Sequence, residues 1–125
     1  MSFGNCLYEA LADKYYKDKS LYIDIKRKLF EGYAKLDYKT KGRMLKKLNL
    51  KNDKAFFDKF QPEGSHGTDY TCIILSRELN IAICVYVVEE KFYTIYNKEK
   101  DPVNVKTIPE GLLYIIIKYY NHHYS

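Results

Sequence analysis

The chain has 125 residues, of which 46% are hydrophobic and 30% charged, and its formal net charge is +5. This length and composition exclude a disordered chain and predict one domain with its own hydrophobic core. No apolar run approaches the roughly 20 residues of a membrane-spanning helix, and the first residues lack the pattern of a secretory signal, so we expect no membrane association.

The first half of the chain reads as helices separated by short polar segments. Apolar residues at helical spacing predict a helix over residues 6–17, and Ser20 is positioned to cap a second helix that ends at Gly32. A short helix over residues 40–50 follows, and Asn52 or the next residue caps another that carries a phenylalanine cluster. The basic residues are spread over these predicted helices, most densely between Lys39 and Lys47, and we interpret them mainly as a solvated face.

The second half changes from helical to extended periodicity. The polar segment 61–67 reads as a loop, and Thr68 as the cap of a helix that ends at Leu79. After Asn80, runs rich in β-branched residues and alternating patterns predict strands over residues 81–88, 92–97 and 112–119, with a polar loop over 98–104. Helices followed by a small sheet predict an α+β domain.

The three cysteines have no short spacing between them. This argues against a disulfide framework and a zinc site, so we expect a reducing, cytoplasmic location, no metal and no cofactor. Cys72 and Cys84 lie in apolar segments and are predicted to be buried thiols of the core. Cys6 differs because it opens the first predicted helix.

The position of Cys6 favours a nucleophilic thiolate. A helix N-terminus stabilises an anion by about 0.3–1 kcal/mol. One pKa unit corresponds to about 1.4 kcal/mol, so the helix alone does not create a thiolate at neutral pH. A histidine that accepts the proton would close this gap.

Three histidines are available as that partner: His66 in the polar loop, and His122 and His123 after the last predicted strand. Neighbouring side chains of an extended segment point to opposite faces, so at most one of His122 and His123 is expected to point toward Cys6.

The residues around Cys6 resemble the nucleophile motif of the OTU (ovarian tumour) family of cysteine deubiquitinases, usually Asp-Gly-Asn-Cys-Leu followed by an aromatic residue. The matching residues are Gly4-Asn5-Cys6-Leu7-Tyr8, with Ala10 and Leu11 beyond. Two later segments are similar to family motifs in the same order: His66-Gly67 before the helix, and His123-Tyr124 after the last strand. The resemblance covers nearly the whole chain. It implies a single domain over residues 1–125, with the α+β fold of the papain-like cysteine protease superfamily: a small mixed β-sheet packed against helices.

The resemblance also implies roles for individual residues. Cys6 would attack the isopeptide carbonyl at the C-terminus of ubiquitin or a ubiquitin-like modifier, with His123 as the general base. The oxyanion hole would be formed by backbone N–H groups of Gly4, Asn5 and Cys6. The loop at His66 and Gly67 would border the substrate channel.

The chain departs from the family pattern at two positions. Phe3 stands where the family has Asp, and Ser125 stands two residues after the histidine, where an orienting Asp or Asn is usual. A histidine without an orienting acid can lose about 10⁴ in rate. Ser125, Asn121 or a backbone carbonyl would then serve as a weaker orienting group. The short segments beyond both motifs indicate a minimal or truncated domain.

Two alternatives stay open at this point. One is a weak or inactive enzyme of the same fold that binds ubiquitin or another protein. The other is a basic nucleic-acid-binding domain that uses the Lys39–Lys47 cluster, which is disfavoured because the chain has 18 Lys and three Arg. We expect a monomer.

Overall fold

The computed structural model describes residues 5–98 and 100–125. The helices of this part are α1 (Cys6–Tyr16), α2 (Tyr22–Ala34), α3 (Tyr38–Lys47), α4 (Asp53–Phe60) and α5 (Asp69–Leu79), with a 3-10 helix, η2 (Lys19–Leu21), before α2. The strands are β1 (Ala82–Val87), β2 (Phe92–Tyr96), β3 (Val103–Val105), β4 (Tyr114–Tyr120) and β5 (His123–Tyr124). No helix among the described residues is long and apolar enough to cross a lipid bilayer.

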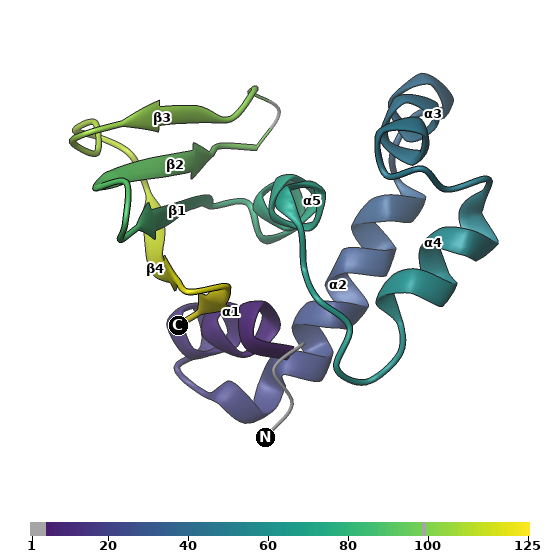
Figure 1. Ribbon diagram of the computed structural model, residues 1–125, viewed down its shortest axis with the longest axis horizontal. Coiled ribbons are helices and arrows are strands. Elements are labelled where there is room, and N and C mark those ends of the chain that lie inside the picture. Colours follow the sequence, from purple (N-terminus) through teal and green to yellow (C-terminus); the bar gives the residue numbers. More distant parts are fainter. Residues whose placement is uncertain (1–4, 99) are drawn as a thin grey trace.

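The strands form one mixed sheet in the order β3-β2-β1-β4-β5. β1 and β4 are parallel, and every other neighbouring pair is antiparallel. The predicted α+β fold with a small mixed sheet against helices is therefore confirmed. Figure 1 shows the sheet at one end of the molecule, α3 and α4 at the other, and α1, α2 and α5 between them.

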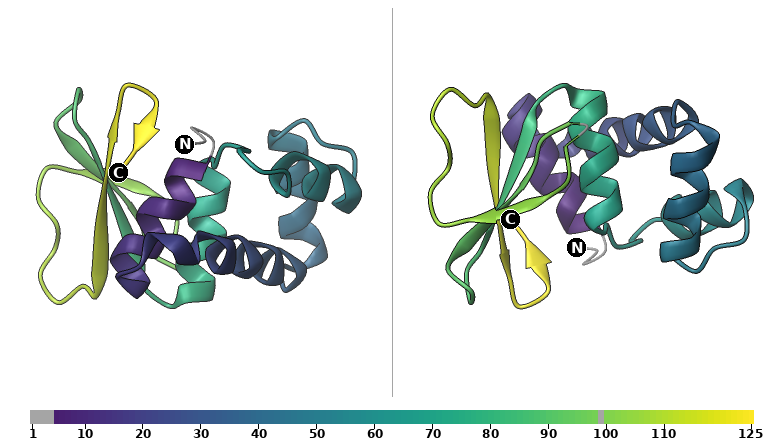
Figure 2. Two further views of the ribbon diagram at one scale, coloured as in Figure 1. Left: turned by 90° about the horizontal axis from the view of Figure 1, so that it is seen from below. Right: turned by 90° about the horizontal axis from the view of Figure 1, so that it is seen from above.

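Figure 2 shows α1 and α5 beside the sheet. The main core joins the sheet to these helices and continues through α2 to Phe56 and Phe60 of α4. On β1, Ile83 and Val85 face this core, whereas Ala82 and Cys84 belong to a second cluster. The alternation follows from the two-residue period of a strand. The second cluster includes Ile108 and Leu112 from the segment between β3 and β4, so this segment covers the face opposite the helices. Cys72 and Cys84 are both fully buried, as predicted.

The start and the end of α2 differ from the prediction. Ser20 does not cap this helix; Asp18 caps η2 instead, and its carboxylate accepts a hydrogen bond from the Ser20 N–H at 3.0 Å. Gly32 does not end α2, which continues to Ala34. A Cβ at Gly32 would lie 2.7 Å from Cγ2 of Ile74, so this glycine permits close packing of α2 on α5.

Two short strands were not predicted. β3 falls partly within the segment that reads as a polar loop, and β5 follows the last predicted strand. β3 is an exposed edge strand of three residues, and β5 has two residues, so neither contains a run long enough to show alternation. β5 is nevertheless the element that approaches Cys6.

Candidate active site

Cys6 is the first residue of α1, and Asn5 occupies the N-cap position. The Cys6 residue is 7% exposed. Its side chain lines a cavity of about 340 Å³ together with His66, Gly67, Tyr119, His122 and Tyr124. The wall of this cavity thus combines the start of α1, the loop before α5 and the C-terminal hairpin. Residues far apart in the sequence form one site.

The C-terminal hairpin is held by a tight turn. Asn121 and His122 both have left-handed backbone conformations, with φ of 51° and 62°, between the paired residues Tyr120 and His123. This pattern is typical of a two-residue type I′ turn, which asparagine favours. The turn folds β5 back along β4 and so directs the last residues toward α1.

The backbone of β5 contacts the sulfur directly. The N–H of Tyr124 donates a hydrogen bond to Sγ of Cys6 at 3.4 Å. The Tyr124 nitrogen is bonded to the carbonyl carbon of His123. Standard bond lengths therefore place the Cα of His123 within about 6 Å of the Cys6 sulfur. Burial raises the pKa of the Tyr124 phenol, which lines the same cavity as Cys6.

The two adjacent histidines have different surroundings. His122 is exposed, lines the same cavity as Cys6, and lies with Nδ1 3.3 Å from the hydroxyl of Tyr119. His123 is half-buried and lines a neighbouring cavity of about 470 Å³ that also includes Ser125 and Asn121. His123 and Ser125 lie on one face of an extended segment and Tyr124 on the other. The cavity of Cys6 is thus lined by His122, whereas His123, the predicted base, lines the neighbouring cavity and meets the sulfur only through its backbone.

The backbone of Ser125 is fixed by the hairpin. Its N–H donates to the carbonyl of Lys118 at 2.9 Å, and its carbonyl accepts from the Lys118 N–H at 2.8 Å. The residue predicted to orient the base is thus held beside His123, two positions away on the same face.

Two of the residues predicted to donate to the oxyanion, Asn5 and Cys6, lie at the start of α1. Backbone N–H groups at the start of a helix have no acceptor within the helix, so those of Asn5 and Cys6 are free of intrahelical pairing. Gly4, the third predicted donor, and Phe3 lie outside the described residues.

The loop that carries His66 and Gly67 packs directly on α1. A Cβ at Gly67 would lie 2.0 Å from Cδ2 of Leu7, and Leu7 is fully buried. Only a residue without a side chain fits this approach, which explains the glycine. Both residues predicted to border the substrate channel line the cavity that contains Cys6.

The Asn5 side chain binds this loop rather than capping α1, a role that the sequence did not reveal. Its Nδ2 donates to Oε1 of Glu63 at 2.5 Å, and its Oδ1 accepts from the N–H of Gly64 at 3.1 Å. Asn5 is 2% exposed, so these partners replace water. The Tyr22 hydroxyl also donates to Glu63, at 2.9 Å, and together with the Asn5 bond it lowers the pKa of the Glu63 carboxyl.

Lys26 of α2 holds the same loop from the other side. Its ammonium group donates to the carbonyls of Pro62 at 2.9 Å and Gln61 at 3.3 Å, and to Oγ of Ser65 at 3.2 Å. Burial lowers the pKa of Lys26. A buried cation needs several acceptors, and the bend of the loop supplies them. Asn5 and Lys26 together fix the loop against the nucleophile.

Among residues 5–98 and 100–125, no group of three or more His, Cys, Asp and Glu side chains is arranged to hold a metal ion. The arrangement is suited to thiol chemistry: a sulfur at a helix start, backbone donors, and three histidines, of which His66 and His122 line the cavity of Cys6 and His123 lines the neighbouring one.

Comparisons with solved structures support an OTU-type fold. The OTU domain of OTUD1 aligns with 99% of this chain over 79% of its own, at 16% identity and a TM-score of 0.67. The viral OTU domain protease from Dera Ghazi Khan virus aligns with 99% of this chain over 74% of its own, at 18% identity and a TM-score of 0.69. An OTU domain in complex with ubiquitin aligns with 99% of this chain over 63% of its own, at 21% identity and a TM-score of 0.73. No protein-family model and no curated protein matches the chain. The similarity predicted from the sequence is confirmed for the fold.

Proposed function

We propose that this chain is a cysteine-type isopeptidase that removes ubiquitin or a ubiquitin-like modifier from proteins. The observation that carries the proposal is the hydrogen bond from the Tyr124 N–H to Sγ of Cys6, which brings the C-terminal histidine segment to the predicted nucleophile. The fold supports it, because one similar structure is an OTU domain in complex with ubiquitin.

The reaction begins with transfer of the Cys6 thiol proton to His123. The sulfur attacks the isopeptide carbonyl and forms a tetrahedral intermediate, whose oxyanion accepts hydrogen bonds from the backbone N–H groups at the start of α1. Before attack, the Tyr124 N–H stabilises the negative sulfur, because a charged acceptor strengthens a hydrogen bond.

The intermediate then collapses with cleavage of the C–N bond. His123 gives its proton to the departing lysine amine, which leaves a thioester on Cys6. A water molecule, deprotonated by His123, attacks the thioester, and the thiolate leaves and recovers the proton. Ser125 is the proposed orienting group for His123, with Asn121 or a backbone carbonyl as alternatives.

Turnover of a fluorogenic ubiquitin isopeptide substrate tests the proposal with four proteins: the unaltered chain, Cys6→Ala, His123→Ala and His122→Ala. We expect kcat/KM to fall at least about 10³-fold for Cys6→Ala and His123→Ala, and to change little for His122→Ala. Equal activity of Cys6→Ala and the unaltered chain would refute the mechanism. A large loss in His122→Ala alone would move the role of base to His122.

A binding protein without turnover is the second candidate, and the observation that favours it is Ser125 in the position of the orienting acid. Ubiquitin binding without hydrolysis would support it. If Ser125 orients His123 poorly, Ser125→Asp increases turnover over the unaltered chain; unchanged turnover would assign orientation to another group.

We also propose a reducing, cytoplasmic location. Cys6, Cys72 and Cys84 are all free thiols in the structure, as expected where disulfides do not form.

A further inference from the structure

A second concave surface lies far from the candidate active site, between α3 and α4. It has a volume of about 1100 Å³ and shares no lining residue with the Cys6 cavity. We call it the α3–α4 groove, and its lining residues are Leu36, Tyr38, Lys41, Gly42, Leu45, Lys46, Asn49, Leu50, Lys51, Asn52, Asp53 and Lys54. The helices that form it lie at the end of the molecule opposite the sheet (Figure 1).

The net positive charge of the chain is concentrated in the segment that forms this groove, which is lined by four lysines and one aspartate. Residues 37–54 contain seven basic and two acidic residues, a formal charge of +5 that equals the formal net charge of the whole chain. The rest of the chain is therefore neutral. α3 itself contains five basic and no acidic residues. A field of one sign over a concave surface attracts partners of the opposite sign.

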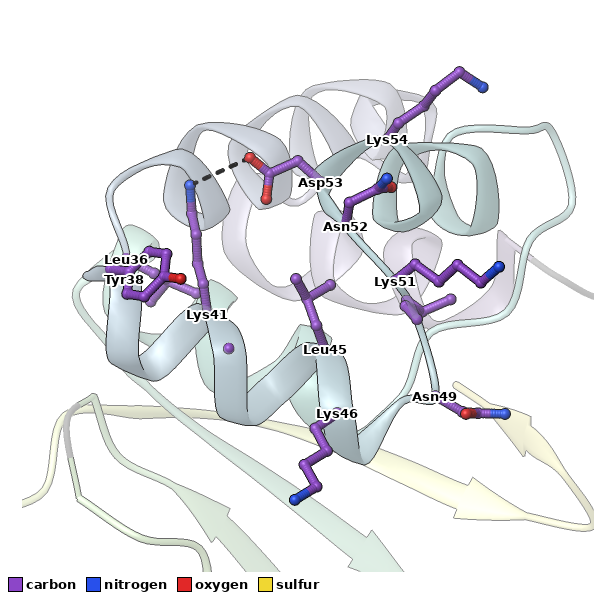
Figure 3. Close-up of a pocket in the computed structure, with 12 residues that line it drawn as sticks. Leu36, Tyr38, Lys41, Leu45, Lys46, Asn49, Lys51, Asn52, Asp53 and Lys54 are labelled. Carbon is purple, nitrogen blue, oxygen red and sulfur yellow. Dashed lines mark ion pairs between the residues drawn. The ribbon is translucent and has the colours of Figure 1, made fainter.

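Two of the groove lysines are unpaired, and two are not. Lys41 forms an ion pair with Asp53 at 3.9 Å, and Lys54 forms one with Asp58 at 2.8 Å. Lys46 and Lys51 are exposed and have no ion-pair partner among the described residues. Figure 3 shows their ammonium groups extending outward from the rim of the groove.

The floor of the groove is apolar. Leu36, Leu45 and Leu50 are half-buried, and Figure 3 shows Leu45 pointing into the groove. Gly42 leaves open space, since a Cβ added there would meet no atom within 4 Å. Tyr38 at one end is 95% exposed. Aliphatic side chains from a partner would gain contacts on this floor.

We propose that the α3–α4 groove binds an acidic peptide segment of a partner protein, with carboxylates at Lys46 and Lys51 and aliphatic side chains on the leucine floor. Nucleic acid is the less favoured occupant. Single-stranded nucleic acid is bound through several stacking aromatic or arginine side chains, whereas this groove is lined by one tyrosine and no arginine. Lysine ammonium groups on an aliphatic floor suit flexible carboxylates beside apolar residues.

The test uses the full chain and a short fluorescein-labelled peptide in which pairs of glutamates alternate with leucines. We expect saturable binding by fluorescence anisotropy that weakens as salt increases. Lys46→Gln together with Lys51→Gln should weaken binding about fivefold or more. The matched control, Lys19→Gln with Lys106→Gln, removes the same charge from exposed positions outside the groove and should leave affinity nearly unchanged.

Two further measurements test the contribution of the apolar floor and the preference for peptide over nucleic acid. Replacing the peptide leucines by alanine, or Leu45 by alanine in the protein, should weaken binding about tenfold if the floor takes part. Oligothymidylate of equal charge should bind more weakly than the peptide. No peptide binding, equal losses in the groove and control variants, or tighter binding of oligothymidylate would each overturn the proposal. Circular dichroism of every variant confirms that it is folded.

Discussion

The close contact between Gly67 and Leu7 makes Gly67→Ala an informative perturbation. The added methyl carbon would lie 2.0 Å from Cδ2 of Leu7 and 3.1 Å from its Cβ and Cγ. Leu7 is fully buried, so its side chain has little room to move away. Since Leu7 follows the nucleophile in the chain, any displacement is transmitted to Cys6.

The magnitude follows from two opposing effects. Overpacking a close-packed interior costs about 1–3 kcal/mol. The backbone at Gly67 is not in the left-handed region, so alanine can adopt it. Alanine also lowers the conformational entropy of the unfolded chain, which stabilises the folded protein by about 0.4–1 kcal/mol. We expect a net loss of about 1–2 kcal/mol in the free energy of unfolding, or a Tm lower by about 4–8 °C for a chain of this length.

The assay is a double-mutant cycle measured by thermal and chemical unfolding. Leu7→Val removes the Cδ atoms, so Gly67→Ala should cost about 1 kcal/mol less in that background than in the unaltered chain. Gly42→Ala is the matched control: it lies within α3 with nothing near the added Cβ, so it should stabilise the protein by about 0.5–1 kcal/mol. Equal costs of Gly67→Ala in both backgrounds would refute the packing argument.

Three more predictions concern the surroundings of the site. Lys26→Met removes the donor to Pro62 and Ser65, so the Gly64 and Ser65 amides should exchange hydrogen faster, measured by hydrogen–deuterium exchange; unchanged exchange would contradict a clamping role. Hydrogen bonds from Tyr22 and Asn5 lower the pKa of Glu63 below its ordinary 4.5. The ionised carboxylate therefore stabilises the folded protein above pH 4.5, and this stabilisation is lost as the pH falls through the lower pKa of Glu63 in the folded state. The difference in unfolding free energy between the unaltered chain and Glu63→Gln should shrink in that acid range, and a pH-independent difference would count against the network. Burial raises the pKa of Cys84 to about 11 and also raises the pKa of Cys72. Iodoacetamide at neutral pH should therefore label only Cys6 in the folded protein, as read by peptide mass spectrometry, and labelling of Cys84 at a comparable rate would be inconsistent with this burial.

The elements with strong local patterns were predictable from the sequence. α1 and α5 carry apolar residues at helical spacing, and β1 is a continuous apolar run, so local sequence determines their type. The short strand β5 carries no such pattern, because its position depends on the turn at Asn121 and His122 and on pairing with β4.

The position of Cys6 was more predictable than the contacts that hold the loop beside it. The motif around Cys6 is local, so its position at a helix start was expected and is observed. The bond between Asn5 and Glu63 joins residues 58 positions apart, and Lys26 reaches the loop across 36 positions to Pro62. Such contacts depend on the tertiary fold, and no spacing along the chain indicates them.

The central claim is that Cys6 and His123 act together on the C-terminus of a ubiquitin-type modifier. Covalent capture tests it most directly: the protein is incubated with ubiquitin that carries a thiol-reactive C-terminal group, and the product is mapped by mass spectrometry. The account predicts one adduct, on Cys6, that is absent in Cys6→Ala, strongly slowed in His123→Ala and retained in His122→Ala. The absence of an adduct from the unaltered chain, or an adduct on another residue, would contradict it.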